Sequence, residues 1–206
     1  MKIDSIGFDL DGTLWNPTVA ITQAWGETAI KYNVHIPSEK EIEGVLGLNQ
    51  KDLMDKLYPD KSDEMKLAFF NEAEALCKAI LGEKGGRLFD GVEETLELLS
   101  KKYKLYIVSN CQDGYIEAFY KAHKLDKYFC DFEHPDKRCL PKGVNLKTLL
   151  ERNGFKNSIF VGDTKGDADA AEHAGLPFVF ASYGFGNVQN PDYIISNFRE
   201  IMDIIK

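Results

Sequence analysis

Short apolar runs alternate with helical segments along the second half of the chain, and this alternation restricts the fold more than any other pattern. The runs at 105–108, 158–161 and 178–180 have the composition of buried strands, and segments with helical spacing of apolar residues separate them. Strands that alternate with helices are typical of a parallel sheet. An earlier apolar run at 3–8 predicts one more strand. We therefore expect an α/β fold built on a parallel sheet.

A long helical insertion is expected directly after the first strand. Residues 17–82 show helical periodicity and almost no strand signal. Thr18 is the predicted N-cap of the first helix, and Ser38 with Glu41 resembles a capping box. The insertion is predicted to hold four helices, at 19–32, from Ser38 onward, at 50–57 and at 62–81.

Length and charge limit the classes of function. A chain of 206 residues can form one core plus a smaller inserted unit. Its formal net charge of -8 argues against non-specific nucleic-acid binding, which needs a basic surface. No apolar run approaches the roughly 20 residues of a membrane span, and the N-terminus does not resemble a signal peptide. We expect a cytoplasmic protein that binds neither membrane nor nucleic acid.

The cysteines favour dispersed, reduced thiols. The chain has 4 cysteines and no Cys-x-x-Cys pair, so a disulfide framework is not expected. Cys130, His134 and Cys139 could in principle ligate zinc. A structural zinc site usually has four ligands in paired short spacings, and no second pair is present. We therefore favour the interpretation that these cysteines are dispersed, reduced thiols over the interpretation that they bind zinc.

Polar side chains follow three of the predicted strands. Ligands bind outside the carboxyl ends of the strands in open parallel sheets, so side chains that are distant in sequence are expected to converge there. The first strand is followed by Asp9 and Asp11, the second by Ser109 and Asn110, and the third by Asp163 and Asp167.

The chemistry of these side chains indicates a site that binds a cation and a phosphate. Asp9 and Asp11 would face the same side of an extended strand, and two close carboxylates need a shared proton or a cation. Taken alone, they are also compatible with an ordinary Asp-Gly turn. An all-oxygen ligand set suits Mg²⁺. Ser109, Asn110 and Lys142 would supply the hydrogen-bond donors and the positive charge that a phosphate needs.

In these residues the chain resembles the haloacid dehalogenase superfamily, in the subgroup of phosphoglycolate phosphatases and β-phosphoglucomutases. Residues 9–14 match the first motif of that family, 108–110 the second and 162–167 the fourth, while Lys142 stands at the third. The resemblance implies a Rossmann-like core with helices on both faces and an inserted all-α cap. It places the core at 1–15 and 88–206 and the cap at 16–87.

The resemblance also implies a mechanism. Asp9 would be the nucleophile that forms an aspartyl-phosphate, and Asp11 would be the general acid and base. Ser109 and Lys142 would hold the phosphoryl oxygens. Mg²⁺ would be bound by Asp9, the backbone carbonyl of Asp11 and Asp163, with Asp167 either a direct ligand or just outside the ligands. The implied enzyme is a Mg²⁺-dependent hydrolase of a small phosphorylated metabolite, as a monomer or small homo-oligomer.

The chain departs from the family pattern at several positions. Lys142 is preceded, not followed, by proline, so Lys137 competes for its role. Trp15 and Asn16 stand where many relatives have a polar pair. The resemblance makes Asn49 and Gln50 candidates for substrate contact, although a helix cap there is equally compatible. Residues 182–186 resemble a loop that flanks the site, and a glycine-rich turn without direct contact is favoured.

Two alternatives stay open. A phosphomutase of the β-phosphoglucomutase type would use the same residues and return the phosphoryl group to the sugar. A non-catalytic phospho-ligand binding protein would keep the fold without turnover, although four intact aspartates disfavour it.

Overall fold

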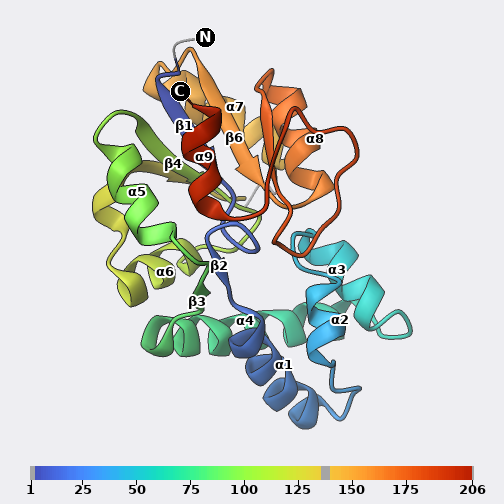
Figure 1. The fold of residues 1–206 in the computed structure, drawn as a ribbon. Coiled ribbons are helices and arrows are strands. Elements are labelled where there is room, and N and C mark those ends of the chain that lie inside the picture. Colours follow the sequence, from blue (N-terminus) through green and yellow to red (C-terminus); the bar gives the residue numbers. More distant parts are fainter. Residues whose placement is uncertain (1–2, 136–139, 206) are drawn as a thin grey trace.

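The computed structural model describes residues 3–135 and 140–205. A six-stranded sheet forms its centre, in the order β5-β4-β1-β6-β7-β8, and every neighbouring pair is parallel. The predicted parallel α/β fold is thereby confirmed (Figure 1). The strands are β1 (Ser5–Phe8), β4 (Lys104–Val108), β5 (Phe129–Glu133), β6 (Ser158–Gly162), β7 (Phe178–Ala181) and β8 (Tyr193–Ile195).

Alternate residues of the strands pack into two separate cores. In β4, Leu105 and Ile107 join the larger core, whereas Tyr106 and Val108 face the smaller one. This follows from the two-residue period of a strand. Helices therefore cover both faces of the sheet. The larger core also packs α5 (Val92–Ser100), α6 (Tyr115–His123) and α9 (Ile201–Ile204), and the smaller one packs α7 (Lys142–Asn153) and α8 (Lys165–Ala174). Two short 3-10 helices lie at Asp126–Tyr128 and Phe198–Glu200.

The helical insertion, defined here as α1–α4, gathers at one end of the molecule (Figure 1). Its four helices are α1 (Thr18–Tyr32), α2 (Glu39–Glu43), α3 (Gln50–Leu57) and α4 (Asp63–Lys84), as predicted. The Ser38–Glu41 capping box is confirmed. The predicted N-cap at Thr18 is wrong, because Pro17 is the capping residue and Thr18 is already helical. The Thr18 amide instead donates to Asn16 Oδ1 at 2.9 Å.

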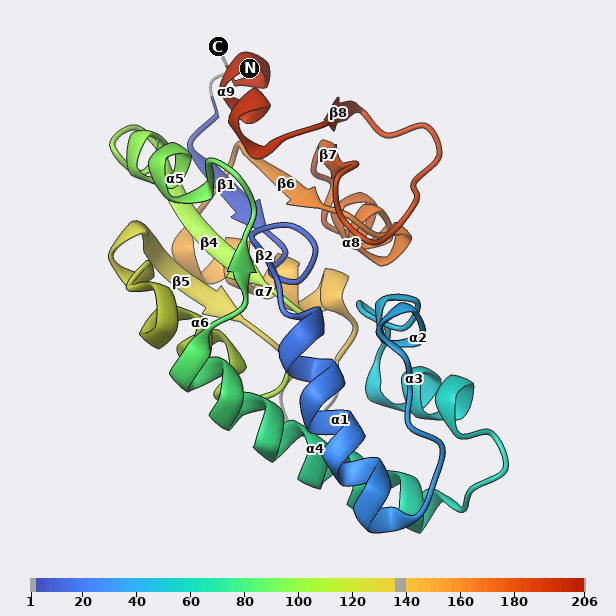
Figure 2. The ribbon, with the colours of Figure 1, turned by 60° about the horizontal axis from the view of Figure 1, so that its bottom comes forward.

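The two connections between sheet and insertion pair with each other. Trp15 and Asn16 form β2, which runs antiparallel to β3 (Arg87–Leu88). This two-stranded ribbon was not predicted, since two residues are too few to show a strand pattern. Figure 2 shows β1, β5 and β6 running towards the insertion, so the carboxyl ends of these strands face it. None of the helices in the described ranges is long and apolar enough to cross a membrane.

Candidate active site

The three strands that carry the predicted site residues are neighbours in the sheet. β1 lies between β4 and β6, and Phe8 is in register with Ile107 on one side and Val161 on the other. The Asp9 amide then donates to the Val161 carbonyl at 2.8 Å. Because parallel strands in register end at one edge, Asp9, Ser109 and Asp163 leave the sheet side by side, as predicted.

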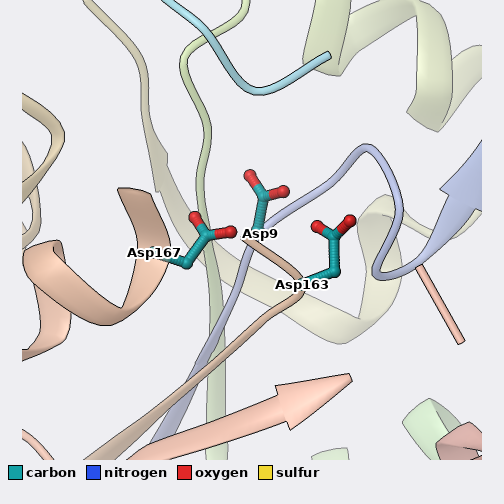
Figure 3. A group of neighbouring side chains, drawn as sticks. All are labelled: Asp9, Asp163 and Asp167. Carbon is teal, nitrogen blue, oxygen red and sulfur yellow. The ribbon is translucent and has the colours of Figure 1, made fainter. Parts of the chain in front are cut away.

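Three carboxylates form the centre of this edge. Asp9, Asp163 and Asp167 each place an oxygen within 4.8 Å of the others, and all three are buried. We call this group the acid cluster. Figure 3 shows the three side chains next to one another, with their carboxyl groups turned to the same side. Together they can offer a set of oxygen ligands to one small cation.

Lys142 lies inside the acid cluster. It is the first residue of α7, and its Nζ is 2.5 Å from Asp9 Oδ1 and 2.5 Å from Asp167 Oδ1. Burial opposes its positive charge, but Asp167 and Asp9 outweigh that effect and raise the pKa of Lys142. The residue is therefore a permanent cation. Its competitor Lys137 lies outside the described residues.

The charges of the group are not balanced. Burial and the charges of Asp167 and Asp163 raise the pKa of Asp9 well above its ordinary value, although Lys142 opposes this. Burial and Asp167 likewise raise the pKa of Asp163 to about 7. One ammonium among three carboxylates leaves two negative charges in a buried place, where they are costly. The donor set and its charge fit one divalent cation that prefers oxygen, such as Mg²⁺.

The fold holds each member of the acid cluster in place. Asp167 closes a capping box at the start of α8, where its Oδ2 accepts from the Thr164 amide and hydroxyl at 2.9 and 2.7 Å. Asp163 Oδ2 accepts from the Phe185 amide at 2.7 Å. A Cβ atom at Gly184 would lie 2.3 Å from the Asp163 Cβ. The expectation that residues 182–186 make no direct contact with the site is therefore wrong.

Asp11 is not a member of the acid cluster. The chain turns after Leu10, and Gly12 has a φ of 83°, so the extended strand assumed for Asp9 and Asp11 does not continue. The carboxylates that raise the pKa of Asp9 most are those of Asp167 and Asp163, while the charge of Asp11 helps to raise the pKa of Asp163. Burial raises the pKa of Asp11 to about 6, a value suited to an acid that gives up and takes back a proton.

The other predicted residues have different surroundings. Ser109 is buried at the end of β4, and its Oγ accepts from the Cys111 amide at 3.3 Å. Asn110 donates from Nδ2 to the Gly47 carbonyl of the insertion at 3.2 Å. Its amide therefore joins the sheet to the insertion.

Asn49 is the N-cap of α3, where Oδ1 accepts from the Asp52 amide at 3.0 Å and Nδ2 donates to Asp52 Oδ2 at 2.7 Å. Gln50 is the first residue of that helix. The helix-cap interpretation of Asn49 is confirmed. Among the described residues, the group suited to a metal is the acid cluster. Cys139 of the alternative zinc site lies outside the described residues.

Several residues of the site were missed. Trp15 and Tyr115 both contact Asp11, and Thr164 and Phe185 hold the acid cluster. Thr164 had a readable signal, because a threonine three residues before an aspartate resembles a capping box. Phe185 lies in the segment 182–186, which resembles a loop that flanks the site. Tyr115 is separated from Asp11 by about a hundred positions, and no local pattern links the two.

Known proteins resemble the chain over nearly its whole length. The family model described as haloacid dehalogenase-like hydrolase matches residues 6–181. A phosphoglycolate phosphatase of Vibrio parahaemolyticus is 27% identical, with 98% of this chain and 96% of that protein covered. A pyrophosphatase of Bacillus mycoides is 25% identical, with 100% and 98% covered. A solved structure of a haloacid dehalogenase-like hydrolase from Streptococcus pneumoniae superposes with a TM-score of 0.88 at 24% identity, covering 100% and 99%.

Proposed function

The chain belongs to the haloacid dehalogenase-like hydrolase family, and we propose that it is a Mg²⁺-dependent phosphatase that hydrolyses a small phosphomonoester through a phosphoryl group on Asp9. The acid cluster with Lys142 in its centre carries this proposal. A buried carboxylate beside a fixed cation is a suitable nucleophile, and the unbalanced charge of the cluster suits a metal and a phosphate together.

In the proposed first step, an Asp9 oxygen bonds to phosphorus while the bond from phosphorus to the leaving-group oxygen breaks. Lys142 contacts Asp9 through Oδ1, so we assign the attack to Oδ2. Asp11 gives its proton to the leaving oxygen. In the second step Asp11 takes a proton from water, the water oxygen bonds to phosphorus, and Asp9 is regenerated as phosphate leaves. In this proposal Ser109, Asn110 and Lys142 hold the phosphoryl oxygens.

The metal would be held by Asp9, Asp163 and Asp167, and the family resemblance adds the backbone carbonyl of Asp11. When bound, Mg²⁺ supplies the positive charge that offsets repulsion between the nucleophile and the phosphate dianion. Thr164 and Phe185 keep Asp167 and Asp163 in place through the hydrogen bonds described above. Such outer hydrogen bonds orient metal ligands.

We also infer that residues 16–87 act as a cap over a core of 1–15 and 88–206. The antiparallel pair β2–β3 is where both connections cross. Cap and core are joined by hydrogen bonds from Asn110 to the Gly47 carbonyl and from Lys78 Nζ to the Asp113 carbonyl at 2.9 Å, and α4 also packs against α6. Closure of such a unit excludes water and adds contacts to the substrate.

The leaving group of the substrate is expected to meet Glu74 on α4. Glu74 lies one helical turn before Lys78, which contacts the loop after β4. Burial and the charge of Asp11 raise the pKa of Glu74 to about 7. The carboxylate of Glu74 near Asp11 would repel a leaving group that carries a negative charge, so a leaving group with neutral hydroxyl groups is favoured. We therefore infer that a polyol phosphate is a better substrate than phosphoglycolate.

Phosphate release from a panel of esters tests the proposal, with Mg²⁺ and with a chelator. We expect release that needs Mg²⁺ and is lost in Asp9→Asn. Asp169→Asn is the control, because Asp169 is exposed on α8 and pairs with Lys165. An isomerised hexose phosphate without net release would support a phosphomutase instead. Binding of the esters without turnover would support a binding protein.

A further inference from the structure

Two side chains hold the Asp11 carboxyl by one of its oxygens. The Trp15 indole Nε1 donates to Asp11 Oδ1 at 2.6 Å, and the Tyr115 hydroxyl donates to the same oxygen at 3.1 Å. Neither residue is in the acid cluster, and neither belongs to the motifs that identify the family. Trp15 is one of the positions at which the chain departs from the family pattern, and it contacts Asp11 directly.

The loop between β1 and β2 brings Trp15 back to Asp11. The Gly12 amide donates to the Trp15 carbonyl at 2.9 Å, and this bond closes a tight loop. Gly12 suits it for two reasons. Its φ of 83° favours glycine, and a Cβ atom there would lie 2.1 Å from Asp163 Oδ2. The same loop therefore sets the Trp15 indole beside Asp11 and leaves room for the acid cluster.

The Trp15 indole is fixed from both sides. Its ring makes edge contacts with Tyr115, Phe119 and His123 of α6, at centroid distances of 5.7, 5.0 and 5.6 Å. The returning connection passes close to its other side, because a Cβ atom at Gly86 would lie 2.9 Å from Trp15 Cε3. The residue has no exposed surface. A ring packed in this way cannot turn without moving α6 or the connections to the cap.

These donors leave the two carboxyl oxygens in different situations. An indole N–H can only donate, and a tyrosine hydroxyl beside a carboxylate donates to it. Two donors occupy Oδ1, so a carboxylic proton is best placed on Oδ2. We propose that Trp15 and Tyr115 are positioning residues that hold Asp11 by Oδ1 and present Oδ2 to the leaving group.

This inference rests on the proposed function, in which Asp11 is the general acid and base. In the first step the Oδ2–H bond breaks and the proton passes to the leaving oxygen, which keeps the electron pair of the broken bond to phosphorus. In the second step Oδ2 takes a proton from the attacking water. Because β2 leads directly into α1, a movement of the cap would also move Trp15 and disturb the acid.

Leaving groups of different basicity test the inference. An alkyl ester such as glycerol phosphate needs a proton on its leaving oxygen, whereas p-nitrophenyl phosphate releases a stable anion and needs little help. Tyr115→Phe and Trp15→Phe each remove one donor and keep a ring. We expect each variant to lower kcat/KM for the alkyl ester by about tenfold or more and to change kcat/KM for the aryl ester by less than about threefold. The ratio kcat/KM reports the transfer to Asp9, whereas kcat also includes the later hydrolysis step that both esters share.

A matched control separates positioning from packing. Tyr106→Phe removes another buried hydroxyl, which contacts Ser158 at 2.8 Å on the smaller core. This control is expected to change the two esters equally. If Trp15→Phe does not fold, Tyr115→Phe alone decides the matter, since it removes a single oxygen.

The outcomes distinguish this inference from the proposed function. Equal losses of kcat/KM for both esters, or no loss of kcat/KM for either, in Tyr115→Phe would overturn the positioning role. Asp11→Asn tests the acid itself on the same two esters. If Asp11→Asn loses activity on the alkyl ester while Tyr115→Phe keeps it, the proposed function stands and the positioning role fails. If Asp11→Asn keeps full activity on the alkyl ester, the assignment of Asp11 as the general acid fails.

Discussion

The sheet side and the cap side of the site are built in different ways. On the sheet side, Asp9, Asp163, Asp167 and Lys142 are all buried, and strand ends and helix starts fix their positions. On the cap side, Asn49 is exposed and bonds within its own helix, and Glu74 is half-buried. Under the proposed function, this difference implies that the reaction depends on the fold of the core, whereas substrate choice depends on a few side chains of α1–α4.

Removal of one sheet-side carboxylate should have the largest effect among the variants that compare the two sides. Asp163→Asn takes a charge from the acid cluster and weakens its fit to a divalent cation. We expect phosphatase activity to fall by roughly a hundredfold or more. We also expect Mg²⁺ to raise the melting temperature of the native protein but not that of Asp163→Asn. Calorimetry with and without Mg²⁺ measures this, and equal stabilisation of both proteins would exclude Asp163 as a ligand.

A cap-side change should alter selectivity and leave the reaction intact. Glu74→Gln removes the charge next to Asp11, so we expect the ratio of kcat/KM for glycerol phosphate to that for phosphoglycolate to fall by roughly fivefold to tenfold. Glu72→Gln on the same helix is the control, since Glu72 pairs with Lys31 at 2.5 Å. A ratio that is equal in the native protein and Glu74→Gln would remove Glu74 from the specificity site.

The same ratio should depend on pH. Burial and Asp11 raise the pKa of Glu74 to about 7, so its carboxyl is mostly neutral at about pH 6 and mostly charged at about pH 8. Discrimination against phosphoglycolate should therefore increase as the pH rises. Because the ratio compares two esters in one protein, titrations common to both cancel. Glu74→Gln should show a flat ratio over this range.

The smallest effect is expected at Asn49. Its side chain caps α3 and bonds to Asp52, so Asn49→Ala should cost about 1 kcal/mol of stability and change kcat/KM by less than about twofold. Ser62→Ala, at the N-cap of α4, is the matched control. A selective loss of activity in Asn49→Ala would return this residue to the substrate site and weaken the contrast between the two sides.

The contrast also explains what could be predicted from the sequence. Asp9, Ser109 and Asp163 could be brought together because each follows an apolar strand, and parallel strands end at one edge. The four helices of the insertion could be found from their periodicity. The contacts of Asp11 with Trp15 and Tyr115, and of Asp163 with Phe185, depend on packing between distant segments, so no local pattern reports them. The start of α8 at Lys165 is set by the capping box that Asp167 closes with Thr164.

The central claim is that the phosphoryl group passes through Asp9, and its direct detection is the decisive measurement. The native protein would be mixed with a phosphomonoester and Mg²⁺, quenched in acid during turnover, digested and analysed by mass spectrometry. We predict a phosphoryl group on the peptide that contains Asp9, and neither phosphoryl group nor phosphate release in Asp9→Asn. A phosphoryl group on another side chain, or full turnover by Asp9→Asn, would contradict the mechanism.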